Sequence, residues 1–179
     1  MTLYKAGMLL VIALLAATVA DAQDPHVYSE YKEQLKATIV YTDKMYLLNM
    51  PEQVIDVEFN FRLKQKQSLK QPERVELMLW SYSRELKYRK DGGRDIGLTT
   101  DGNTLKVEKV IYMPFQKRKK DFERIKDAYA EWVILYFSPE EVKKLATAKN
   151  IKLRMGNQEF NFKDNYMNTI RDFASRIPE

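Results

Sequence analysis

The chain has 179 residues, 45% of them hydrophobic, which is enough for one domain with its own core. It contains no cysteine and one histidine. This composition excludes disulfides, thiolate metal sites and thiol catalysis, and it gives no support to sites built from several histidines. The formal net charge is +5, so a basic surface could meet an anionic partner.

The N-terminus has the three parts of an export signal. Lys5 supplies a short basic region, residues 8–20 are apolar, and Ala20-Asp21-Ala22 has small residues at the first and third positions of a cleavage site. A membrane anchor is the alternative, but the apolar run is shorter than the roughly 20 residues that cross a bilayer. We therefore expect cleavage near Ala22, a periplasmic or secreted protein, and no transmembrane span in the mature chain.

The segment after the cleavage site is expected to be a flexible leader over residues 23–28. It contains Pro25 and the single histidine, His26, which we interpret as an ordinary tail residue because a general base is hard to position there. A single domain is expected over residues 29–179, with a short helical or extended lead-in at its start.

The clearest strand covers residues 55–64. Its apolar residues alternate strictly with polar ones, and they are Ile55, Val57, Phe59, Phe61 and Leu63. Period two predicts one buried face and one face in water. Asp56 and Glu58 are expected on the wet face.

Further strands are predicted from apolar runs that end at turn residues. They cover residues 37–42, 44–49, 75–82, 86–90, 96–100, 105–113, 129–137, 151–155 and 159–162. Asp91-Gly92-Gly93 and Asp101-Gly102-Asn103 predict hairpin turns of a meander. Val107 and Val110 are out of phase, which predicts a bulge or kink between them.

Two helices are expected in the last quarter of the chain. Ser138, Pro139 and Glu141 match an N-cap, a first helical position and a capping box, so a short helix should run to about Ala146. A longer helix should begin near Asp164. Its apolar stripe consists of Tyr166, Met167, Ile170, Phe173, Ala174 and Ile177. The fold class predicted is α+β, a mostly antiparallel β-sheet with a short helix and a C-terminal helix packed on one face.

No motif for catalysis or nucleotide binding is present in the sequence. Asp56 and Glu58 would project from one strand face about 7 Å apart, a possible spacing for a hydrolytic acid pair. A charged outer face is the favoured interpretation, because Arg62 and Lys64 follow in line. No catalytic residue, metal site or cofactor is therefore expected.

Acidic residues near the glycine turns suggest calcium binding at first sight. Asp91, Asp95 and Asp101 nevertheless lack the ligand spacing of a calcium loop, so turn formation is the favoured role.

The densest basic cluster is Lys117, Arg118, Lys119 and Lys120. It is a possible contact for an anionic lipid or glycan, and the export signal argues against nucleic acid. A solvated surface is the alternative, because acidic residues follow closely. Tyr82, Tyr88 and Tyr112 could share a sheet face that binds a partner, or they could fill the core.

The last third of the chain resembles the end of certain uncharacterised exported bacterial α+β domains. The resemblance rests on a helix, a hairpin and a terminal helix: Glu141-Val142-Lys143-Lys144-Leu145-Ala146, then Ala148-Lys149-Asn150-Ile151-Lys152-Leu153-Arg154-Met155-Gly156, a Phe-x-Phe strand, and Ile170-Arg171-Asp172-Phe173-Ala174-Ser175-Arg176. It implies an exported α+β domain and brings no activity or site residue.

The sequence thus favours an exported, non-catalytic binding or assembly module of the cell envelope. An envelope protein or an anionic lipid or glycan is the expected kind of partner. Two alternatives stay open: a carrier of a lipid or another apolar or anionic ligand, and a hydrolase that uses Asp and Glu alone.

Overall fold

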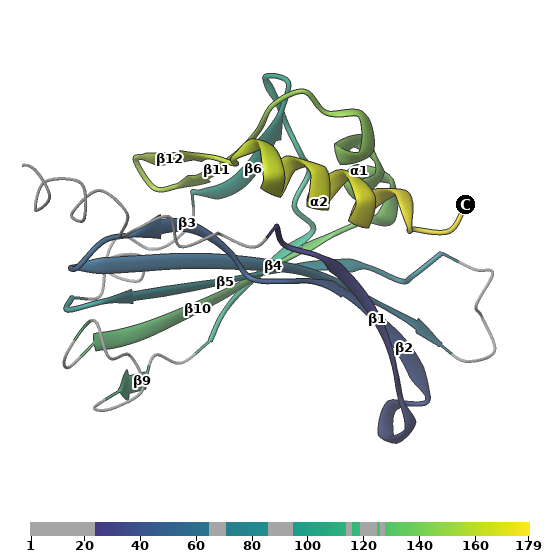
Figure 1. The fold of residues 1–179 in the computed structure, drawn as a ribbon, viewed down its shortest axis with the longest axis horizontal. Coiled ribbons are helices and arrows are strands. Elements are labelled where there is room, and N and C mark those ends of the chain that lie inside the picture. Colours follow the sequence, from purple (N-terminus) through teal and green to yellow (C-terminus); the bar gives the residue numbers. More distant parts are fainter. Residues whose placement is uncertain (1–23, 65–70, 86–94, 114–115, 119–124, 126–127) are drawn as a thin grey trace, which may run out of the picture.

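The computed structural model describes residues 24–64, 71–85, 95–113, 116–118, 125 and 128–179 (Figure 1). These residues form two antiparallel sheets and a C-terminal helix. The predicted α+β class is therefore confirmed, with one difference. The strands divide between a large and a small sheet, whereas a single sheet was expected.

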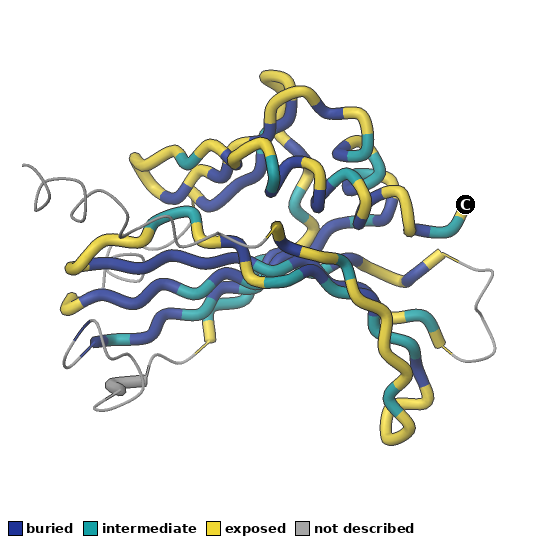
Figure 2. The backbone as a smooth tube through the Cα atoms, in the orientation of Figure 1, coloured by how far each residue is buried: buried dark blue, intermediate teal, exposed yellow. Residues whose placement is uncertain are grey.

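The large sheet has the strand order β1-β2-β4-β5-β10-β8, with β3 paired to β4 and β9 paired to β10. Its strands are β1 (Val27–Lys32), β2 (Ala37–Thr42), β3 (Met45–Asn49), β4 (Gln53–Lys64), β5 (Val75–Ser83), β8 (Lys109–Tyr112), β9 (Gln116–Arg118) and β10 (Ala128–Phe137). β4, β5 and β10 form the centre and are buried over most of their length (Figure 2). β1 and β2 curve away from the side on which the C-terminal helix lies (Figure 1).

The small sheet has the order β12-β11-β6-β7. Its strands are β6 (Ile96–Thr100), β7 (Asn103–Thr104), β11 (Ile151–Met155) and β12 (Gln158–Asn161). The turn between β6 and β7 places Asp101 and Gly102 at φ 49° and 83°, as the Asp-Gly signal predicts. β6 pairs with β11 of the small sheet, so it is not part of the meander that the sequence predicts. The predicted strand over 86–90 lies outside the described residues.

The helical segments are η1 (Glu33–Leu35), α1 (Pro139–Lys143), η2 (Lys144–Thr147) and α2 (Asp164–Ser175). The predicted N-cap of α1 is confirmed, because the Ser138 hydroxyl oxygen accepts a hydrogen bond from the Glu141 backbone nitrogen at 3.4 Å. The Glu141 carboxylate, predicted to complete a capping box, instead accepts a hydrogen bond from the Lys106 backbone nitrogen at 3.0 Å. The single helix expected as far as Ala146 is an α-helical turn that continues as a 3₁₀ turn.

The region predicted as one kinked strand over 105–113 also differs. Within it, only β8 (Lys109–Tyr112) is a strand. Leu105 is buried in the core, and its backbone nitrogen donates to the carbonyl oxygen of Leu98 at 2.8 Å.

The main core lies between the large sheet and the layer formed by α2 and the small sheet (Figure 1). We call the sheet face that carries this core the inner face. Phe173 of α2 packs against Phe59 and Phe61 of β4, with ring centroids 5.6 and 5.2 Å apart. All three rings are at most 1% exposed, so this contact fixes the helix on the sheet.

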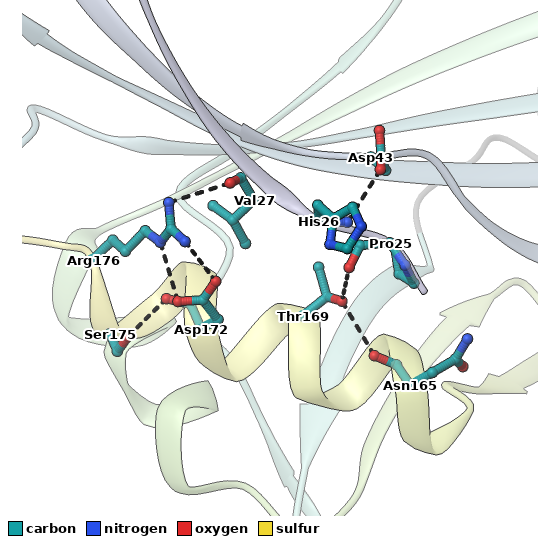
Figure 3. A network of polar contacts seen from close by, with 9 residues as sticks. All are labelled: Pro25, His26, Val27, Asp43, Asn165, Thr169, Asp172, Ser175 and Arg176. Carbon is teal, nitrogen blue, oxygen red and sulfur yellow. Dashed lines mark hydrogen bonds and ion pairs between the residues drawn. The ribbon is translucent and has the colours of Figure 1, made fainter. Parts of the chain in front are cut away.

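The start of the described chain is tied to α2, contrary to the expected flexible leader (Figure 3). Pro25 is buried, and its carbonyl oxygen accepts a hydrogen bond from the Thr169 hydroxyl at 2.6 Å. Arg176 donates to the carbonyl oxygen of Val27 at 3.2 Å. The backbone nitrogen of His26 donates to the Asp43 carboxylate at 3.1 Å. Residues 24–28 therefore belong to the fold, and β1 begins at Val27.

No helix among the described residues is long and apolar enough to cross a membrane.

Candidate functional site

The candidate site lies on the face of the large sheet opposite α2, which we call the outer face. This face carries buried polar side chains that do not belong to the main core. Alternation along β4 places Phe59 and Phe61 on the inner face, so Asp56, Glu58 and Asn60 point to the outer face. The sequence predicts this side assignment correctly.

The outer face is not uniformly wet, and that part of the prediction is wrong. Asp56 is 2% exposed, Asn60 6% and Val54 1%. A second apolar cluster also lies on this face, and neighbouring strands contribute large side chains to it. Its members are Val54, Tyr82, Ile125, Ala128 and Ala130, with Trp80 and Trp132 packed against them.

Four residues form a row across the outer face, and we call it the aromatic row. Tyr46 of β3, Asp56 of β4, Trp80 of β5 and Trp132 of β10 are successive partners in the strand register. The two indole rings meet edge to face, with centroids 6.4 Å apart and an interplanar angle of 78°. A carboxylate therefore lies between aromatic side chains in a largely buried position.

Lys44 places its ammonium group over this row from the connection between β2 and β3. Its Nζ lies 4.3 Å from the centroid of the Trp80 ring and 3.8 Å from Oδ1 of Asp56. The first contact is a cation–π interaction, whereas the second is too long for a hydrogen bond. The Lys44 side chain is 44% exposed, so the ammonium group reaches the row from solvent.

Two polar atoms of the row have no hydrogen-bond partner in the part of the chain that the structure describes. They are Oδ1 of Asp56 and Nε1 of Trp132, and both atoms are buried. A buried polar atom without a partner costs free energy, so each needs an explanation in a folded protein.

Burial raises the pKa of both acids on β4. The pKa of Asp56 rises to about 6, against the opposing effect of the Lys44 ammonium. The pKa of Glu58 rises to about 7, chiefly by burial, while Lys44 lowers it and the carboxylates of Asp56 and Asp43 raise it further. Near neutral pH the carboxyl groups of Asp56 and Glu58 therefore carry negative charge together, and the single positive charge of Lys44 offsets only part of it.

A hollow of about 320 Å³ opens beside Glu58 on the same face. Its walls are Glu30, Lys32, Ile39, Tyr41, Glu58, Asn60, Arg62, Glu76 and Met78. Glu30 pairs with Lys32 at 2.6 Å, and Glu76 pairs with Arg74 at 3.4 Å. Glu58 has no ion pair with any described residue, so it is the acid in this hollow that is open to a ligand.

A second hollow, of about 220 Å³, lies next to η1, where β2 begins and β4 ends. Apolar residues such as Leu35 and Phe61 line it together with Arg62, Lys64 and Arg74. The Lys64 ammonium is paired with Glu73, which offsets part of its charge.

The structure describes two of the four residues of the predicted basic contact. Lys117 and Arg118 belong to β9, which pairs with β10. Lys119 and Lys120 lie outside the described residues, so this contact stays a prediction.

Asp101 has a structural role. Its carboxylate accepts hydrogen bonds from the backbone nitrogens of Lys149 and Asn150, at 3.1 and 2.9 Å, and thereby fastens the β6–β7 turn to the start of β11. For Asp101, the predicted role in turn formation is therefore confirmed. Asp91 lies outside the described residues, and no group of three potential metal ligands occurs among the residues described.

The tyrosines of the meander do not share a face. Tyr82 pairs with Val54 and Ala130 on the outer face, whereas Tyr112 pairs with Val133 on the inner face. Tyr88 lies outside the described residues. The His26 ring contacts the ring of Tyr28, with centroids 6.4 Å apart.

Sequence reasoning missed Lys44, Trp80 and Trp132 as site residues. The period-two patterns of residues 75–82 and 129–137 identify which side chains share a face with each tryptophan. They do not show that the two tryptophans are register partners, because that pairing depends on how the strands align.

Comparison of the chain with protein-family models, with curated proteins and with solved structures finds no match. The site must therefore be interpreted from its own geometry.

Proposed function

We propose that this protein is an exported, non-catalytic binding module of the cell envelope and that the outer face of the large sheet is its binding surface. The observation that carries the proposal is the aromatic row. In this row, Oδ1 of Asp56 and Nε1 of Trp132 are buried and have no hydrogen-bond partner among the described residues. The open hollow beside Glu58 lies next to the row. Buried polar atoms without partners reduce the stability of the fold, so a purely structural role does not account for them.

The export signal supports the location. Ala20-Asp21-Ala22 is followed within a few residues by Pro25, which is buried in the fold. A mature chain that begins at Gln23 would retain every residue of the described domain.

A hydrolytic role for Asp56 and Glu58 has one supporting observation, the raised pKa of both carboxyl groups. One observation opposes it. The Asp56 side chain is only 2% exposed and lies against Lys44, so a substrate bond cannot sit between two accessible acids. Binding is therefore the better use of this geometry.

The proposal is tested by in-cell crosslinking followed by mass spectrometry of the envelope fraction. Wild type is compared with Trp80→Leu, and Tyr31→Leu is the matched control because Tyr31 is an exposed aromatic residue of β1. We expect a partner that wild type and Tyr31→Leu retain and that Trp80→Leu loses, with all three proteins folded by circular dichroism.

The same spectra report the mature N-terminus, expected at Gln23. Equal recovery of every partner by folded Trp80→Leu would refute the outer face as the binding surface. Recovery of full-length chain beginning at Met1 would refute processing.

A further inference from the structure

The aromatic row already holds an ammonium group. Lys44 Nζ lies 4.3 Å above the Trp80 ring and 3.8 Å from the Asp56 carboxylate. An aromatic face and a carboxylate are the two groups that together stabilise an organic cation in a partly dry site.

The site is incompletely neutralised. Asp56 Oδ1 makes no hydrogen bond within the described part of the chain, although it is buried. Glu58 adds a second carboxyl group, and Asp43 lies close enough to influence it. Among the described residues, the Lys44 ammonium thus offsets the charge of two carboxyl groups, those of Asp56 and Glu58. This local excess of acid is complementary to a cation.

Lys44 is free to leave the row. Its side chain is 44% exposed, and among the residues that the structure describes it makes the long ion pair and the ring contact alone. The backbone beside it is held independently, since Asp43 nitrogen donates to the carbonyl oxygen of His26 at 2.9 Å. The side chain can therefore swing into solvent without loss of the β2–β3 connection.

We propose that Asp56, Glu58 and Trp80 form a binding site for an organic ammonium or guanidinium group and that Lys44 is the resident cation which this ligand displaces. The proposal rests on the proposed function and names the ligand class of that surface. A ligand ammonium that approaches Asp56 within hydrogen-bond distance satisfies Oδ1, and its body lies along Met78 and Tyr41 in the hollow beside Glu58.

Other ligand classes fit less well. A phosphate or carboxylate would meet Asp56 and Glu58 as like charges. An alkyl chain would leave Oδ1 of Asp56 unpaired, and a hydroxyl group would pair it without offsetting the charge.

The experiment is a calorimetric titration of the mature protein at about pH 8, where both acids are ionised. The probes are n-butylammonium and, as its neutral counterpart, n-butanol. We expect saturable binding of the ammonium only. Lys44→Gln should bind it about fivefold more tightly, because the resident competitor is gone, and Trp80→Leu at least about tenfold more weakly.

Two variants serve as controls. Lys44→Arg keeps a resident cation and should therefore not show the tighter binding expected of Lys44→Gln. Lys152→Gln removes an exposed positive charge from β11 of the small sheet, away from the hollow, and should leave the affinity within about twofold. Spermidine and Nα-acetyl-lysinamide then distinguish a free polyamine from a basic side chain of a partner as the natural source.

The proposal is overturned if neither wild type nor Lys44→Gln binds n-butylammonium, or if n-butanol binds equally well. It is also overturned if affinity is unchanged in folded Trp80→Leu. If the cation fails while Trp80→Leu still loses a crosslinked partner, the ligand class is wrong and the proposed function stands.

Discussion

Asp56→Asn should stabilise the protein, and more at about pH 8 than at about pH 5. Burial raises the pKa of Asp56 from 3.8 to about 6, so the unfolded chain ionises this group more readily than the folded chain. The free energy of unfolding is least reduced by Asp56 below the pKa that this group has in the unfolded chain, where it is protonated in both states. This stability is lost as the pH rises through the pKa that the group has in the folded protein. Each pKa unit corresponds to about 1.4 kcal/mol, so ionised Asp56 costs the fold about 3 kcal/mol at neutral pH and above.

Asparagine keeps the shape of the side chain and removes this cost, but it also removes the partner of Lys44. Because Lys44 is exposed and its ion pair is long, that loss is small, and we expect a net gain of about 1 to 3 kcal/mol at about pH 8. At about pH 5 the carboxyl group is mostly protonated in the folded protein. The gain should then be smaller by about 1 kcal/mol.

The assay is urea unfolding of wild type and Asp56→Asn at both pH values, followed by tryptophan fluorescence. Glu159→Gln is the control, because Glu159 is an exposed acid whose loss should change stability by less than about 0.5 kcal/mol at either pH. A variant that is less stable than wild type at about pH 8, or a gain that grows as the pH falls, would refute the burial of an ionised Asp56.

Three further predictions concern the fold and are measured by urea unfolding. Thr169→Val removes the buried hydrogen bond to Pro25 and should cost about 1 to 2 kcal/mol; an unchanged stability would mean that the N-terminal segment is not held to α2. Asp101→Ala removes the carboxylate that fastens the β6–β7 turn and should cost about 1 to 3 kcal/mol, whereas Asp101→Asn, which keeps one acceptor oxygen, should cost less. Phe173→Ala should cost about 3 to 5 kcal/mol because the ring fills the space above Phe59 and Phe61, and a cost below about 1 kcal/mol would contradict that packing.

Local signals in the sequence predict local structure well in this chain. Ser138 caps α1, Asp101 and Gly102 form a hairpin turn, and the alternation along β4 identifies its inner face. Each of these features depends on residues that are neighbours along the chain, so a short window of sequence contains the whole cause.

Features that depend on distant residues were not predicted. Asp56 is buried on the outer face, and its neighbours there, Tyr46 and Trp80, are set by the register of β3 and β5 with β4. The bond that holds the N-terminal segment joins Thr169 to Pro25, 144 positions apart. Neither residue carries a local signal for the other, and an expected leader therefore proved to be part of the fold.

The central claim is that the aromatic row binds a cationic ligand, and the chain offers a direct reporter because it contains two tryptophans, both in this row. The measurement is a titration of the ¹⁵N-labelled protein with n-butylammonium, followed through the two indole N–H resonances. The account predicts saturable shifts of both indole resonances, with the larger shift at Trp80 and with tighter saturation in Lys44→Gln. Indole resonances that stay fixed in both proteins, while backbone resonances elsewhere shift, would contradict it.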